Sequence, residues 1–128
     1  MVNSRAKGNR AEREVIKTLK KYFPGRFERR TMGLAGADIV APGDFKWAIE
    51  VKHDKSVRLK HIWKPTLKLM DFWLQARTQA AIAKKTPLLI AKIEGIWLCW
   101  EEIPNSFDFA HWVHEFEDWC KDNEDRSP

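Results

Sequence analysis

Three residues near the middle of the chain, Asp38, Glu50 and Lys52, are of the types that bind a metal ion and act on a phosphate group. Segment 45–52 alternates apolar with other side chains, which predicts a strand that has Glu50 and Lys52 on one face. A hairpin loop over 43–45 or over 42–46 places Asp38 opposite Glu50, with the side chains roughly 5 Å apart. A loop of even length breaks this pairing.

Two carboxylates that lie this close repel each other unless a cation lies between them or one is protonated. Their hard oxygen ligands suit Mg²⁺ or Mn²⁺. Lys52 reaches the same place, where an ammonium group can neutralise charge, orient a water or stabilise a phosphorane-like transition state. The alternative is an ordinary strand on which Lys52 forms a salt bridge with Glu50.

Glu12 is a third candidate because it falls on the apolar stripe that Val15, Ile16 and Leu19 form in the first predicted helix. A carboxylate on such a stripe is seldom left without a partner. It either completes a metal site with Asp38 and Glu50 or flanks the stripe and pairs with an arginine or lysine.

The elements that must position these side chains follow from hydrophobic periodicity and turn residues. Helices are expected at 4–22, 65–85 and 107–122, and strands at 26–31, 37–41, 46–52, 87–93 and 96–100. The basic segment 53–64 is expected to be a loop or a sheet edge. The order αβββαββα predicts an α/β fold with helices against a mixed sheet.

The length of 128 residues fits one domain, and 44% hydrophobic with 32% charged residues indicates a folded chain. No apolar run approaches the roughly 20 residues of a membrane span, and the basic N-terminus lacks the apolar stretch of a secretory signal. Cys99 and Cys120 form no disulfide framework, so we expect reduced thiols and the cytosol.

The net charge of +5 is unevenly distributed. Residues 1–68 hold 17 Lys and Arg against 7 Asp and Glu, whereas residues 69–128 hold 6 against 11. The basic half indicates a polyanionic partner such as nucleic acid, or else a solvated basic face.

Four segments in order resemble those of an archaeal-type Holliday junction resolvase of the PD-(D/E)xK nuclease superfamily. They are Lys7-Gly8-Asn9-Arg10-Ala11-Glu12-Arg13-Glu14, Arg30-Thr31-Met32-Gly33, Gly36-Ala37-Asp38-Ile39-Val40-Ala41 and Ala48-Ile49-Glu50-Val51-Lys52. The resemblance runs from about residue 5 to residue 100. Ala37 stands where the superfamily motif has proline.

The resemblance implies a restriction-endonuclease-like αβββαβ core with a mixed central sheet, within a nuclease domain at 1–103. It assigns metal binding to Glu12, Asp38 and Glu50, with Lys52 as the catalytic lysine. It also implies Mg²⁺, with Mn²⁺ as a substitute, and a homodimer that cuts opposed strands of a four-way DNA junction to leave 5′-phosphate ends. A compact resolvase fits an archaeon or a bacteriophage, and a phage enzyme would act in the host cytoplasm.

Basic residues around this motif are expected to contact DNA. By the resemblance, Arg13 and Arg30 lie near the scissile phosphate. The full expected set is Lys7, Arg10, Arg13, Arg29, Arg30, Lys55, Arg58 and Lys60. The alternative for the segment 55–61 is a solvated loop.

Gln75 is a candidate for active-site support, since several superfamily members carry a helical glutamine near the active-site lysine. It is otherwise a routine helix-surface residue. Most of the seven tryptophans are expected in the core or a dimer interface, and the spacing of the histidines and cysteines matches no standard zinc site.

The segment 104–128 lies beyond the resemblance and is expected to form an acidic amphipathic helix and a tail packed on the same domain. It caps the domain, extends the dimer interface or docks a protein partner. Its acidic side chains would repel DNA, so we expect them away from the active-site face.

Three functional hypotheses follow. The first is a Mg²⁺-dependent endonuclease that resolves branched DNA. The second is another nuclease on the same scaffold, of the nicking, restriction-like or end-processing kind. The third is a DNA-binding protein whose acidic cluster is only structural.

Overall fold

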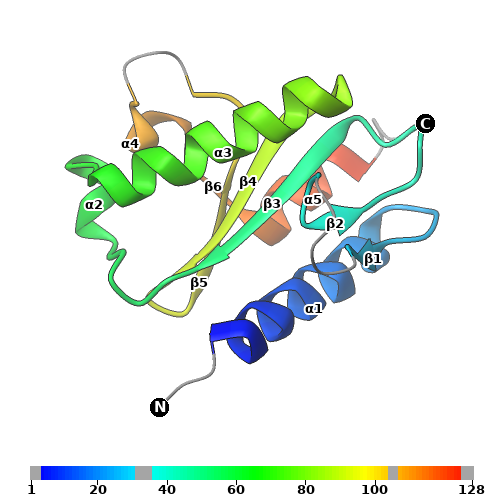
Figure 1. The fold of residues 1–128 in the computed structure, drawn as a ribbon, viewed down its shortest axis with the longest axis horizontal. Helices are drawn as coiled ribbons and strands as arrows, with labels where there is room; N and C mark the ends of the chain where they lie inside the picture. Colours follow the sequence, from blue (N-terminus) through cyan, green and yellow to red (C-terminus); the bar gives the residue numbers. More distant parts are fainter. Residues whose placement is uncertain (1–3, 31–35, 104–106, 125–128) are drawn as a thin grey trace.

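The computed structural model describes residues 4–30, 36–103 and 107–124, and for residues 4–8 it describes the backbone alone. The helices are α1 (Ser4–Tyr22), α2 (Lys60–Trp63), α3 (Leu67–Ala83), α4 (Phe109–Trp112) and α5 (Phe116–Asn123). The strands are β1 (Glu28–Arg29), β2 (Ile39–Val40), β3 (Trp47–His53), β4 (Thr86–Ile93), β5 (Ile96–Trp100) and β6 (His114–Glu115). Figure 1 shows their arrangement.

The strands form one mixed sheet in the order β1-β2-β3-β4-β5-β6. β3 and β4 are parallel, and the other neighbours are antiparallel. Parallel strands need a long crossover connection, and here α2 and α3 supply it. The predicted α/β fold with a mixed sheet is confirmed.

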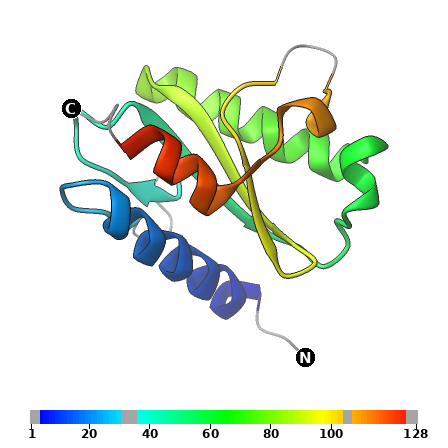
Figure 2. The same cartoon turned by 180° about the vertical axis from the view of Figure 1, so that it is seen from behind.

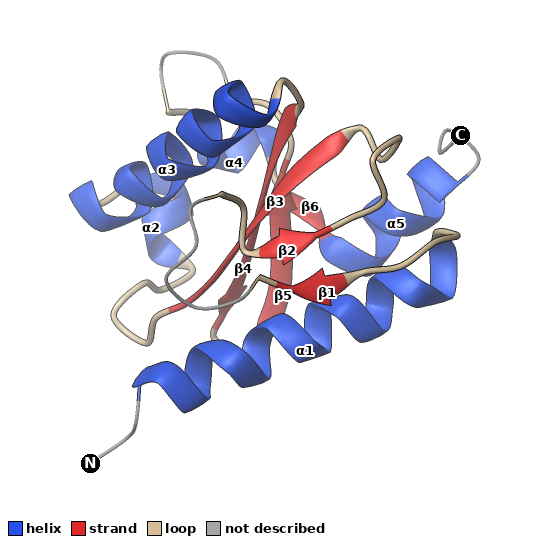
Figure 3. Ribbon diagram, turned by 45° about the vertical axis from the view of Figure 1, so that its right-hand side comes forward, coloured by secondary structure: helices blue, strands red, loops and turns tan. Residues whose placement is uncertain are grey.

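Two hydrophobic clusters lie on opposite faces of the sheet. One joins α1 and α5 to the sheet through residues such as Leu19, Ile49 and Trp119. The other joins α3 and α4 to it through Trp73, Trp100 and others. In Figure 2, α5 lies in front of the sheet and α3 lies behind it, whereas Figure 3 shows β1 and β2 running beside α1.

The strand β3 connects both clusters because its side chains alternate. Trp47, Ile49 and Val51 belong to the cluster under α1, so Glu50 and Lys52 face the side that α3 covers. The alternation that predicted this strand therefore also determines which face holds the candidate chemistry.

The helix α3 begins after a proline and a capping threonine. The Thr66 hydroxyl accepts a hydrogen bond from the Leu69 amide, and Lys84 ends the helix in the left-handed conformation at φ 57°. Its apolar face is fully buried on the sheet at Leu69, Trp73, Ala76 and Ala80.

The prediction of one helix over 107–122 is wrong. Val113 is extended, at ψ 140°, and separates α4 from α5, while the following residues pair with β5 as β6. The segment 53–64, expected to be a loop or an edge, contains α2. The first two strands are shorter than predicted, and residue 31 lies outside the described residues.

The helix α5 packs on the same sheet as the rest of the fold. Trp119 meets Trp47 edge to face at 4.8 Å between ring centroids. The ring centroid of Phe23, which directly follows α1, lies 6.1 Å from that of Trp119. Among the described helices, none is both long and apolar enough to cross a lipid bilayer.

Candidate active site

Asp38 and Glu50 face each other across the β2–β3 hairpin. Ile39 pairs with Ile49 in the antiparallel register, which sets Asp38 opposite Glu50 as the odd loop predicts. The Asp38 amide donates to the Ile49 carbonyl at 3.0 Å. One Asp38 carboxylate oxygen accepts from the Val51 amide at 2.8 Å. The backbone of β3 therefore fixes the direction of the Asp38 carboxylate.

Glu50 is the most deeply buried of the candidate acids, with 4% of its surface exposed. Burial and the neighbouring Asp38 carboxylate raise its pKa to about 8, although Lys52 opposes this shift. A buried acid beside a second carboxylate is costly to ionise. The pair is thus built to favour a bound cation or a shared proton.

Lys52 extends from the same face of β3 toward α3. Its Nζ donates to Gln75 Oε1 at 2.7 Å, lies 4.0 Å from Glu50 Oε2, and stands 5.4 Å from the centre of the Phe72 ring. Lys52 therefore makes contacts beyond the salt bridge with Glu50 that the alternative hypothesis proposed. Gln75 and Phe72 hold its ammonium group from α3.

Glu12 takes a different place from the one expected of a metal ligand. Its Oε1 accepts from Arg29 Nε at 3.0 Å, and Arg29 also donates to the Asn9 side chain. Burial and the Asp38 charge raise the Glu12 pKa, and Arg29 and Lys52 act against them. The Glu12 carboxylate thus lies within the electrostatic reach of Asp38 but pairs with an arginine.

The donor set fits a hard divalent cation only in part. Asp38 and Glu50 offer carboxylate oxygens side by side, which suits Mg²⁺ or Mn²⁺. Over the described stretches of chain, no three His, Cys, Asp or Glu side chains are arranged to hold a metal ion. Glu12 would have to leave Arg29 to become a third ligand.

Two of the expected DNA-binding arginines make internal contacts. Arg29 holds Glu12, and Arg30 Nε donates to the Ala37 carbonyl. A Cβ at Gly36, where φ is +123°, would lie only 2.6 Å from the Arg30 guanidinium carbon. Glycine at this position therefore lets Arg30 lie against the backbone that leads into Asp38.

The other expected basic contacts lie on two surfaces. Arg10 and Arg13 are exposed on α1, and the side chain of Lys7 lies outside the described residues. The exposed side chains that follow β3 are Lys55, Arg58 and Lys60. Arg58 donates to Glu94 at 3.3 Å, which fixes this segment to the β4–β5 turn.

Two side-chain contacts, one at the site and one that docks α1, were missed from the sequence. Phe72 lies under Lys52, and its place three residues before Gln75 was the available signal because such residues share a helix face. Glu14 accepts from Trp97 Nε1 at 2.9 Å and from Lys92 Nζ at 3.3 Å, which docks α1 on the β4–β5 hairpin. No local pattern pairs residues so far apart in sequence.

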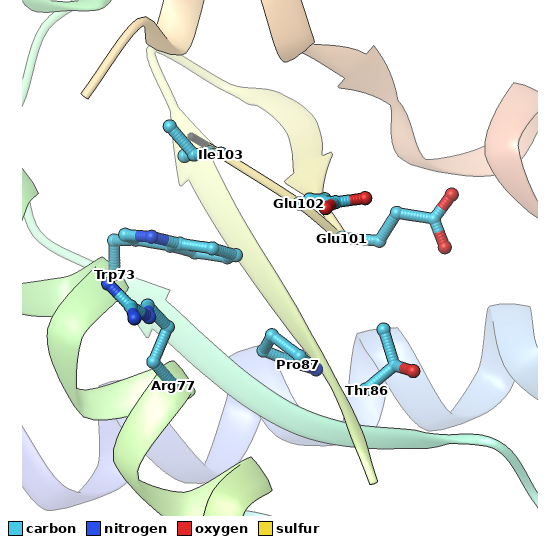
Figure 4. A pocket seen from close by; sticks show the side chains of 7 residues that line it. All are labelled: Trp73, Arg77, Thr86, Pro87, Glu101, Glu102 and Ile103. Atoms are coloured by element: carbon cyan, nitrogen blue, oxygen red, sulfur yellow. The ribbon is translucent and has the colours of Figure 1, made fainter. Parts of the chain in front are cut away.

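A separate hollow of about 530 Å³ lies against the middle of α3 and contains none of the candidate catalytic residues. Figure 4 shows its lining, which is Trp73, Arg77, Thr86, Pro87, Glu101, Glu102 and Ile103. Glu101 accepts from the Trp47 indole at 2.8 Å. This acid therefore supports the core.

No curated protein matches the chain. The model of a family described as "Phage putative PDDEXK endonuclease" matches residues 3–96. The matched range contains Glu12, Asp38, Glu50, Lys52 and Gln75, and it ends before the acidic segment 104–128. With the fold and the Asp38–Glu50–Lys52 arrangement described above, this match shows that the chain belongs to the phage PDDEXK endonuclease family, within the PD-(D/E)xK nuclease superfamily.

Proposed function

We propose that this protein is a structure-selective endonuclease that resolves four-way DNA junctions by metal-dependent hydrolysis of phosphodiester bonds. The observation that carries the proposal is the pairing of Asp38 with the buried Glu50, with Lys52 on the same face. The resemblance to archaeal-type resolvases is the reason for proposing a four-way junction as substrate. It is also the reason for proposing a homodimer whose two sites cut opposed strands. In a phage setting the enzyme would act in the host cytoplasm.

Asp38 and Glu50 would hold the ion, Mg²⁺ or in its place Mn²⁺. When bound, the ion supplies Lewis-acid stabilisation of the charge that develops on the phosphate oxygens. The Val51 amide keeps Asp38 aimed at the site. Glu12 joins as a further ligand if a DNA phosphate draws Arg29 away from it.

Lys52 neutralises negative charge on the reacting phosphate. An ammonium group has three N–H donors, and one of them is used by Gln75. The two others remain for a phosphate oxygen or for a water that attacks it. Because Gln75 fixes the ammonium group before substrate arrives, little reorganisation is required in the transition state.

The basic side chains of α1 and of the segment after β3 would grip the DNA backbone. Phosphate contacts position a duplex but carry no sequence information. A small nuclease that relies on them recognises the shape of its substrate. This argument favours a branched substrate over a sequence-defined site.

The second candidate is another branched-DNA, nicking or restriction-like nuclease with the same catalytic residues. The family match favours it directly, since the family is described by endonuclease chemistry alone. A non-catalytic DNA-binding role is disfavoured by the costly burial of Glu50 beside Asp38.

The deciding experiment compares end-labelled substrates with and without Mg²⁺. They are a synthetic four-way junction, its linear duplex, a single strand and a Y-junction. Paired symmetric cuts confined to the four-way junction support the resolvase. Broad cutting of branched forms supports the second candidate, and binding without cutting in either Mg²⁺ or Mn²⁺ contradicts an enzymatic role.

A further inference from the structure

Trp63 is an exposed aromatic residue at the end of α2. It leaves 72% of its surface to solvent, and Leu67, the first residue of α3, leaves 78%. A contiguous exposed apolar patch, unlike a single exposed residue, marks a surface that binds a ligand or partner. The turn that presents Trp63 is held in place because Ile62 is buried and the Lys64 amide donates to the Lys60 carbonyl.

A hollow of about 440 Å³ lies beside the Trp63 ring. Its lining is apolar and aromatic apart from one acid, and consists of Ile62, Trp63, Pro65, Met70, Phe107 and Asp108. The Asp108 carboxylate caps α4 by accepting from the His111 amide at 3.1 Å. The hollow thus presents two aromatic side chains and an aliphatic floor, which suits a planar apolar group.

Two unpaired lysines lie next to this hollow, while Asp108 supplies the one negative charge of its lining. Lys60 lies three residues before Trp63 and Lys64 directly follows it, and both are exposed. Within the described residues, neither ammonium group pairs with a carboxylate. By contrast, Arg58 pairs with Glu94 at 3.3 Å and Lys68 with Asp54 at 3.0 Å. Two free cations beside an exposed indole complement a planar group that is joined to phosphates.

We propose that Trp63 is a stacking platform for an unstacked nucleobase, which enters the hollow beside it while Lys60 and Lys64 contact the adjoining phosphates. The inference rests on the proposed nuclease function and extends it to the substrate. Aromatic side chains stack on any base, and each stacked base contributes measurably to affinity. A regular duplex offers no unstacked base, whereas a branch point or a single strand does.

The position of the platform fits the candidate active site. Leu67 and Gln75 lie eight residues apart on α3, which is about 12 Å at 1.5 Å per residue. That length corresponds to roughly three or four base steps at 3.4 Å. The stacked base would therefore lie a few nucleotides from the phosphate at Lys52.

The test measures DNA binding without divalent cations, so that the substrate stays intact. The probes are a four-way junction with 2-aminopurine at the branch and the linear duplex of the same sequence. The variants are Trp63→Ala, Trp63→Phe and the control Ile82→Ala, which removes a side chain 70% exposed near the other end of α3. Urea unfolding checks that each variant is as stable as the wild type.

Trp63→Ala is expected to weaken junction binding about tenfold, which is about 1.4 kcal/mol, and duplex binding less than twofold. Trp63→Phe keeps most of the affinity, and Ile82→Ala keeps all of it. The 2-aminopurine signal changes when the wild type binds and does not change with Trp63→Ala.

Three results overturn the inference. If Trp63→Ala binds the junction as the wild type does, the platform is absent and the nuclease proposal stands. An equal loss on junction and duplex means a general contact, and a loss of dimer mass at unchanged DNA affinity assigns Trp63 to a second copy of the chain. A wild type that neither binds nor cuts DNA contradicts both proposals.

Discussion

At the scale of single residues, Lys52 depends on a side chain from another element. Its Nζ donates to Gln75 at 2.7 Å but lies 4.0 Å from Glu50. The shorter contact determines where the ammonium group points. Under the proposed function, Gln75 would therefore be a positioning residue that acts on the phosphate only through Lys52.

We predict that Gln75→Ala lowers kcat on the preferred DNA substrate about tenfold, less than the roughly 100-fold that a 1 Å misplacement of a catalytic group can cost, and changes KM less than twofold. Gln75→Glu keeps an acceptor for Lys52 and retains most of the rate. Thr78→Ala is the matched control, because the Thr78 hydroxyl donates only to the Leu74 carbonyl of the same helix. An unchanged kcat in Gln75→Ala contradicts the positioning role.

The two cysteines are predicted to be inert in the folded protein. Burial raises the pKa of Cys120 to about 12 and that of Cys99 well above its usual value, and both residues are buried. Because the thiolate is the reactive form, a thiol-reactive disulfide reagent at pH 8 should label neither cysteine until denaturant is added. Rapid labelling of the native protein would show that α5 opens away from the sheet.

At the scale of elements, the docking of α1 depends on Glu14. Burial alone would raise the Glu14 pKa, but the hydrogen bonds from Trp97 and Lys92 outweigh it and hold the pKa below the ordinary 4.5. Since the folded pKa is lowered, the ionised carboxylate stabilises the fold above about pH 4.5, and this contribution is lost as the pH falls.

We predict that Glu14→Ala lowers the free energy of unfolding at pH 7 by about 1 kcal/mol, the usual value of such hydrogen bonds after solvent screening. In acid the difference from the wild type shrinks. Urea unfolding at pH 7 and pH 3 measures it, with the exposed Lys17→Ala as control. A difference that persists unchanged at pH 3 contradicts the electrostatic part of this account.

Much of the fold could be predicted because its long elements have clear periodicity. The alternation in β3 and the odd loop before it were enough to predict the Asp38–Glu50 pairing. Gln75 was a candidate through the superfamily resemblance, but its contact with Lys52 depends on how α3 crosses the sheet.

The segment after residue 106 misled the prediction, because its apolar spacing fits one continuous helix. In the structure, Glu115 accepts from the amides of Glu117 and Asp118 and so caps a new helix. Local capping outweighs periodicity there. The pairing of Glu12 with an arginine was one of the two alternatives for this residue, but the choice of Arg29 depends on the position of β1 against α1.

At the scale of the whole molecule, the acidic helix α5 and the catalytic candidate Lys52 lie on different faces of the sheet. The acidic helix α5 packs under β5 and α1, and Glu117 pairs with Lys21 of α1 at 3.4 Å. Lys52 and Gln75 lie on the opposite face of the sheet. The sheet therefore separates the acidic side chains of α5 from Lys52 and Gln75.

We predict that Lys55→Ala reduces the slope of log affinity against log salt for duplex DNA by about 0.9, because one phosphate contact is lost.

The double variant Asp118→Asn, Asp122→Asn changes four-way junction affinity less than twofold. Both side chains are exposed on α5. A large gain in affinity for the double variant would place α5 beside the DNA and contradict this arrangement.

The most direct test of the central claim is cleavage and binding of a four-way junction by Asp38→Asn and Glu50→Gln, with Asp44→Asn on the exposed β2–β3 turn as control. Each active-site variant removes one carboxylate of the proposed ion-binding pair and preserves the size of the side chain. The account predicts that both abolish Mg²⁺-dependent cutting while junction affinity stays within threefold of the wild type, and that the control cuts normally. Cutting that survives either substitution would contradict the assignment of Asp38 and Glu50 as the catalytic pair.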